Sequence, residues 1–161
     1  MNYLAIYLND HLGGATGGVE LARRLRTSNS GDDTFGPPLD RVCSEIEEDR
    51  ATLERIIKGL GFSASTVKPA GAWVVEKLGR LKLNGRLRGY SPLSRLLELE
   101  GLLIGITSKI ALWKTLAGSD EGQGLGIDFE QLANRAAEQR STVEDLHRLA
   151  AVAILKSAAP G

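Results

Sequence analysis

The sequence predicts an all-α protein in which four long helices form one bundle in up-down-down-up order. Three observations predict this fold. Apolar residues recur at helical spacing in four segments, and no segment shows the strict alternation of a β-strand. The connections also differ in length: two are short, whereas about thirty residues separate the second helix from the third. The long connection allows the third helix to begin at the end of the bundle where the second helix began. We therefore expect a single domain over residues 1–161.

The first helix is expected over residues 2–27, where apolar side chains follow a period of about 3.6 residues. The loop TSNSGDDTFGPP ends it. Pro37 and Pro38 suit the first turn of a helix, so the second helix is expected to begin there and to continue to Gly61. The short loop predicts that these two helices form an antiparallel hairpin.

The long connection, residues 62–90, is expected to contain a shorter helix over residues 69–83. Ser91 followed by Pro92 combines an N-cap residue with the helical position that tolerates proline. The third helix is therefore expected to begin there and to extend to about residue 117.

The loop GSDEGQGLGI separates the third helix from the fourth. Asp128 is the expected N-cap of the fourth helix, and Gln131, three residues later, completes a capping-box pattern. Apolar spacing extends this helix to about residue 156, so it forms the second hairpin with the third helix.

Glycines stand inside two of the predicted helices, and each costs about 1 kcal/mol relative to alanine. Their i, i+4 spacing predicts close packing against another helix or against a second copy of the chain. Two alternatives remain open at this point: an interrupted first helix, and a pocket left by the small residues. The residues concerned are Gly13, Gly14, Gly17 and Gly18 in the first helix and Gly101 and Gly105 in the third.

Charge and cysteine content restrict the function classes. The 20 basic and 20 acidic residues give zero net charge, so we expect no nucleic-acid or membrane partner. The single cysteine, Cys43, excludes an intramolecular disulfide and is expected to be a buried small residue. No segment has the features of a signal peptide, and no apolar stretch reaches the roughly 20 residues of a membrane span. A cytoplasmic protein is expected.

Basic residues are concentrated in the long connection. A solvated basic face is favoured over a site for phosphate or an acidic partner, because aromatic residues are not interleaved with them. They are Lys68, Lys77, Arg80, Lys82, Arg86 and Arg88.

Four runs resemble the corresponding runs of bacterioferritins and their ferritin-like relatives: YLNDHLGG, CSEIEEDRATLERIIKGLG, KLGRLKLNG and LLELEGLLIG. The resemblance covers most of the chain and implies a ferritin-like bundle. In active members, two metal ions are bound in the bundle core by one Glu from each of two helices and a Glu-x-x-His pair from each of the other two.

Most of the positions of this chain that match these ligands hold a different residue. The glutamate of the first helix falls at or beside Ala15. The pair on the second helix becomes Glu45 and Glu48, and the glutamate of the third helix matches Glu98. On the fourth helix Glu138 lies near the acid position.

The histidine position of the fourth helix holds Arg140 or Ser141. We therefore interpret the core as a degenerate site in which Arg140 neutralises Glu45, Glu48 and Glu98 in place of metal. The alternative is that these side chains lie on solvated helix faces.

The two histidines are candidate metal ligands. Glu144 and His147 have Glu-x-x-His spacing but lie about two turns beyond the family position, so a surface pair is favoured. His11 lies on the apolar face of the first helix and is expected to be a hydrogen-bonded core histidine, or an imidazole ligand if metal binds.

The sequence thus supports a non-catalytic ferritin-like module with a structural or binding role, expected to be a homodimer without cofactor. One alternative is an iron or manganese protein with an altered ligand set, comprising Glu45, Glu48, Glu98, Glu138 and His11. Another is a carrier that holds a small apolar ligand in the space left by Ala15 and the glycines.

Overall fold

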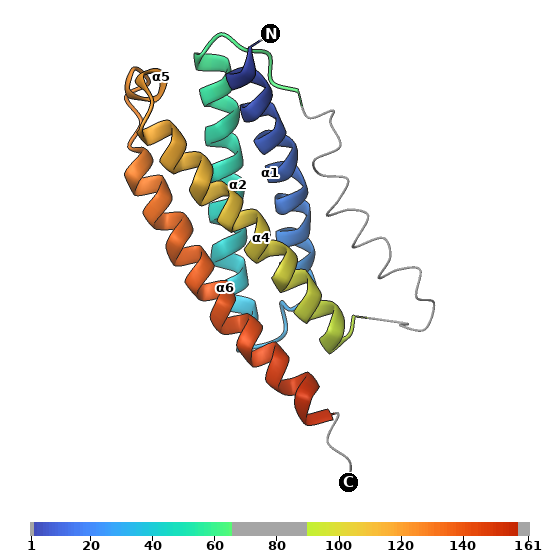
Figure 1. Cartoon of the computed structure of the whole chain (residues 1–161). Helices are drawn as coiled ribbons and strands as arrows, with labels where there is room; N and C mark the ends of the chain where they lie inside the picture. The colour runs from blue at the N-terminus through green and yellow to red at the C-terminus, as the bar shows by residue number, and fades with distance from the viewer. Residues whose placement is uncertain (1, 66–89, 158–161) are drawn as a thin grey trace.

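The structure is a computed structural model that describes residues 2–65 and 90–157, and this part of the chain is helical with no strand. The all-α prediction is confirmed. The predicted helix over residues 69–83 and the basic residues of the long connection lie outside the described residues. The elements are α1 (Tyr3–Ser28), α2 (Gly36–Gly59), α4 (Pro92–Ala117), the short α5 (Asp120–Gln123) and α6 (Phe129–Ser157) (Figure 1).

Side chains cap the helices where the sequence predicts. Oγ of Ser91 accepts a hydrogen bond of 3.1 Å from the backbone N–H of Ser94, and Oδ1 of Asp128 accepts one of 2.8 Å from that of Gln131. Both satisfy backbone donors that have no partner inside the helix. The single turn of α5 was not predicted, because its glycine-rich segment shows no apolar periodicity.

The four long helices form two hairpins that pack against each other. α1 pairs with α2 and α4 with α6, and the hairpins meet mainly through α1 and α4. Arg95, near the start of α4, forms an ion pair of 3.2 Å with Asp32 in the α1–α2 loop. α4 therefore begins at the end of the bundle where α2 begins. Figure 1 shows the result: α1 and α6 run in one direction, and α2 and α4 in the other.

Apolar side chains from all four long helices fill the space between them. Trp113 of α4 is almost completely buried, and its ring lies 6.2 Å from that of Phe129 at the start of α6. Cys43 is also buried, as predicted, and burial raises the pKa of its thiol. Other members of the core are Leu8, Leu12, Leu25, Leu39, Leu53, Ile57, Leu99, Leu102, Val143 and Leu146.

No helix in residues 2–65 and 90–157 combines the length and apolar character that a membrane span needs.

α1 is continuous across its glycines, so the alternative of an interrupted helix is wrong. Close packing occurs at Gly101, where a Cβ atom would lie 3.1 Å from Cδ2 of Leu21. At Gly14, Gly18 and Gly105, by contrast, no atom lies within 4 Å of the position that a Cβ would take. These three glycines leave open space instead of bringing another helix close.

This contrast predicts opposite effects of alanine at two helical glycines. Gly14→Ala is expected to raise the free energy of unfolding by about 1 kcal/mol, since it gains helix propensity without a clash. Gly101→Ala is expected to gain less or to destabilise, because the side chain of Leu21 must move. Urea unfolding of both variants measures the difference, and a Gly14→Ala variant less stable than the parent would contradict the open space described for it.

Candidate functional site

A cavity of about 340 Å³ lies between α1, α2 and α4. The glycines form much of its wall: Gly14 and Gly18 come from α1, and Gly101 and Gly105 from α4. Its volume is within the ~300–1,000 Å³ of typical small-molecule sites, towards the lower end. The remaining lining is mostly aliphatic, including Ala15, Leu21, Ile46, Leu53, Leu102, Ile106 and Leu112.

Three of the polar lining residues lie towards one end of the cavity, whereas Arg50 donates to Thr16 beside the glycines of α1. α1 and α4 are antiparallel, and Leu21 lies against Gly101. His11, ten residues before Leu21, is therefore level with the segment of α4 that contains Lys109 and Trp113, which also line the cavity. The cavity thus has a polar end at these three residues and an apolar end near Leu21.

A buried ion-pair network adjoins the polar end. Asp49 of α2 is 2 % exposed, and Nζ of Lys109 lies 2.5 Å from its Oδ2. Nζ of Lys109 also donates to Oε1 of Gln139 at 2.5 Å, and Nε2 of Gln139 donates to Oδ2 of Asp49 at 3.2 Å. Arg135 donates to Oδ1 of Asp49 and pairs with the exposed Glu48 at 2.9 Å. One carboxylate on α2 therefore joins α4 and α6.

The local environment shifts the pKa of Lys109 and of His11. Burial lowers the pKa of Lys109, and the Asp49 carboxylate opposes this shift. Burial likewise lowers the pKa of His11, against the charge of Asp10, so its imidazole is neutral at pH 7. The ring of His11 packs edge-on against Tyr7, with centroids 4.6 Å apart.

The expected neutralisation by Arg140 is wrong. Its side chain is 44 % exposed and pairs with Glu144 at 3.3 Å, one turn along α6. Glu138 is also exposed, and Glu48 is exposed apart from its contact with Arg135. The cations that neutralise the buried acid are Lys109 and Arg135, because these side chains point between the helices.

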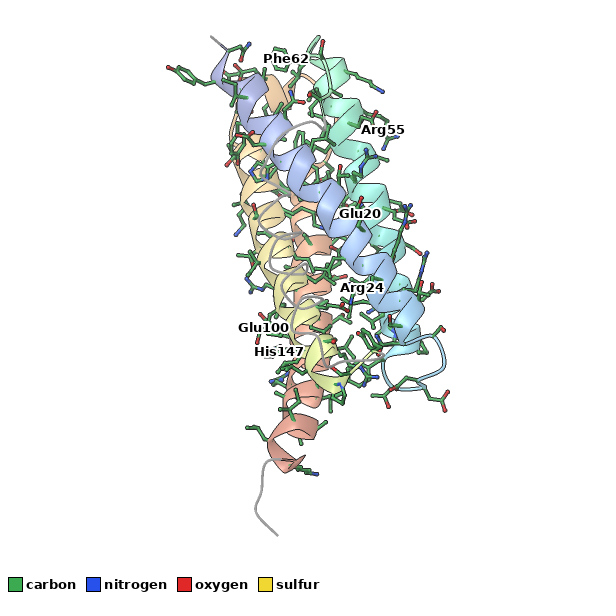
Figure 2. The ribbon with its side chains drawn as sticks, turned by 90° about the vertical axis from the view of Figure 1, so that its right-hand side faces the viewer. Glu20, Arg24, Arg55, Phe62, Glu100 and His147 are labelled. Atoms are coloured by element: carbon green, nitrogen blue, oxygen red, sulfur yellow. The ribbon has the colours of Figure 1, made fainter. Side chains whose placement is uncertain are left out.

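Of the predicted acids, Glu45 is half-buried and its charge acts on Lys109. Glu98 is fully buried, but it lies beside Arg24 of α1, whose Nε is 2.6 Å from its Oε1. Figure 2 shows Arg24 on the lower half of α1. Neither carboxylate oxygen of Glu98 has a hydrogen-bond partner of ordinary geometry in the described part of the chain. Burial raises the pKa of Glu98, opposed by the Arg24 charge and the nearby Tyr90 hydroxyl.

The predicted acids therefore do not form the ligand set that a di-metal centre requires. Across residues 2–65 and 90–157, no three His, Cys, Asp or Glu side chains come close enough to hold a metal ion. His147 forms a surface pair, as predicted, but its partner is Glu100 of α4 at 3.2 Å and not Glu144 (Figure 2).

Asp49, Lys109 and Gln139 were missed, although the sequence carries a signal for each. Each stands where the helical period places an apolar residue: Asp49 between Ile46 and Leu53, Lys109 between Ile106 and Trp113. A charged residue inside an apolar stripe is buried with a partner or lies next to a cavity, and here Asp49 and Lys109 do both.

No protein-family model, curated protein or solved structure matches the chain.

The network predicts a large stability loss when its central carboxylate is neutralised. Asp49→Asn is expected to lower the free energy of unfolding by about 3 kcal/mol or more, because it leaves Lys109 buried without a counter-charge. Glu48→Gln is the matched control, since it removes an exposed partner of the same Arg135 and is expected to cost less than about 1 kcal/mol. If both variants lose the same free energy of unfolding in urea, the buried Asp49–Lys109 pair contributes no more to stability than the exposed Glu48–Arg135 pair.

The raised pKa of Glu98 predicts that the stability of the fold depends on pH. Its pKa is raised in the folded state above 4.5, so the folded chain holds this proton more tightly than the unfolded chain. The stabilisation from Glu98 is therefore full below about pH 4.5 and is lost as the pH rises through the folded-state pKa.

Glu98→Gln is expected to remove this part of the pH profile. The melting temperature of the variant relative to the parent should then increase from acidic to neutral pH, as measured by circular dichroism. Glu100→Gln, an exposed neighbour on α4, is the control. Parallel profiles for the parent and Glu98→Gln would contradict the raised pKa.

Proposed function

We propose that the chain is a non-catalytic binding module that holds a small, largely apolar molecule in the cavity between α1, α2 and α4. The observation that carries this proposal is the cavity itself, with glycines on both facing helices that leave space unfilled. The cavity is partly open to solvent, since Asp10, Ile104 and Ser108 of its lining are exposed, so a small molecule has a route into its volume of about 340 Å³. Concave, mostly apolar sites with a few polar groups are typical of small-molecule binding.

We further propose that the bundle is ferritin-like. The helix directions and the start of α4 beside the α1–α2 loop support this topology. Ala15, which stands where the resemblance implies a metal-binding glutamate, lines the cavity. The ligand would then occupy part of the space that the relatives use for metal. The iron or manganese alternative has less support, because Glu45, Glu48, Glu98 and Glu138 do not converge.

A cytoplasmic location and a homodimeric state are part of the same proposal. The single reduced cysteine supports the first. Three exposed apolar side chains at the end of α6 support the second, since they follow one another at intervals of three residues: Leu149, Val152 and Leu155.

A neutral apolar probe, 1-decanol, tests the binding function by isothermal titration calorimetry and thermal unfolding. We expect saturable binding, with an increase in unfolding free energy of about 2.7 kcal/mol when the probe is present at about 100 times its Kd. Gly18→Leu is expected to weaken binding by about tenfold or more, because the added side chain occupies the cavity.

Glu20→Leu is the matched control, since Glu20 is exposed on α1 and does not line the cavity (Figure 2). It places the same side chain two residues along the same helix and should leave decanol affinity unchanged. Equal loss in both variants, or no saturable binding by the parent, would refute the proposed function.

A further inference from the structure

Trp113, a residue of the cavity wall, has a buried donor without an acceptor. Trp113 is 1 % exposed, and its indole Nε1–H has no hydrogen-bond partner in the described part of the chain. A buried N–H without a partner is unfavourable, so a molecule that supplies an acceptor to it binds more tightly. Among the buried polar atoms without partners, Trp113 Nε1 is the one whose residue lines the cavity.

A second donor lies beside the first. Lys109 precedes Trp113 by four residues on α4, so the two side chains share one face of the helix. An ammonium group has three N–H donors, and Asp49 and Gln139 accept from Nζ of Lys109. One N–H of Lys109 therefore has no acceptor among residues 2–65 and 90–157, and Lys109 lines the cavity.

An ammonium donor favours an anion over a neutral acceptor, because a hydrogen bond between charged groups is the stronger one. Lys109 shares the buried carboxylate of Asp49 with Arg135, which is 29 % exposed and also pairs with Glu48 at 2.9 Å. Glu45 is half-buried, as Arg135 is, and its charge acts on Lys109. Asp10, which also lines the cavity, is exposed.

We propose that the ligand of this cavity is an amphipathic carboxylate, a small aliphatic or aromatic acid. Its carboxylate accepts from Lys109 and Trp113, and its apolar body lies along the glycines towards Leu21. This inference rests on the proposed function and names the ligand class for the same cavity.

Decanoate and 1-decanol, which have the same chain length, separate the two proposals. For the parent chain near neutral pH we expect decanoate to bind about tenfold more tightly than decanol, because a hydrogen bond to a charged group is gained. Equal affinities would overturn the carboxylate inference and leave the proposed function standing. Absence of binding by both probes would overturn both.

Trp113→Phe and Lys109→Met test the two donors. Both should weaken decanoate binding by about fivefold or more and weaken decanol binding less, because the decanol hydroxyl is a neutral acceptor, whereas a structural defect would weaken both probes alike. Trp113→Phe keeps the aromatic packing and remains informative if Lys109→Met fails to fold. Lys114→Met is the control, because Lys114 is exposed on α4 outside the cavity. If it removes the decanoate preference as fully as Lys109→Met does, overall charge is responsible and the inference is overturned.

Discussion

The buried carboxylate of Asp49 is the contact on which the arrangement of the bundle depends. α2 and α6 face each other over the least extensive interface of neighbouring long helices, and Asp49 joins them through Arg135 and Gln139. It also holds Lys109, and therefore α4, at the wall of the cavity. A buried ion pair contributes little more to stability than apolar packing does, but a buried charge that has lost its partner is strongly destabilising. A change in the register of α2, α4 and α6 would separate these charges and is therefore unfavourable.

The two buried carboxylates in the described part of the chain, Asp49 and Glu98, are neutralised in different ways. Asp49 has two cations and a buried amide, so its charge is compensated by hydrogen bonds as well as by attraction. Within residues 2–65 and 90–157, Glu98 has one cation, Arg24, whose side chain is 39 % exposed, and no hydrogen bond of ordinary geometry. Desolvation therefore dominates at Glu98, which gives the bundle a pH-sensitive group near the start of α4 in addition to His11 at the cavity.

Much of the fold could be predicted from the sequence because its signals are local. Helix ends follow from caps such as Ser91 and Asp128, and the burial of Cys43 follows from its place in an apolar stripe. The site was predicted less well, because a shift of one residue turns a side chain by about 100° around the helix. Glu48 was chosen where Asp49 is buried, and Glu138 where Gln139 is buried.

Which charges meet across helices could not be predicted in the same way. The choice of Arg135 over Arg140 depends on how α6 is rotated and shifted against α2, and no local pattern specifies that register. The interrupted apolar stripes at Asp49 and Lys109 carried enough information to place both between helices, though not to pair them.

The glycines of α1 have an unfavourable effect on stability that the structure does not offset locally. Gly14 and Gly18 lower helix propensity by about 1 kcal/mol each, and neither brings a neighbouring helix closer. Alanine would fit at both positions, so the backbone does not require glycine there. What glycine provides and alanine does not is the full width of the cavity, which Gly105 also lines. In the proposed function, a ligand fills this space and supplies an acceptor for the N–H of Trp113, which has no partner in the described part of the chain.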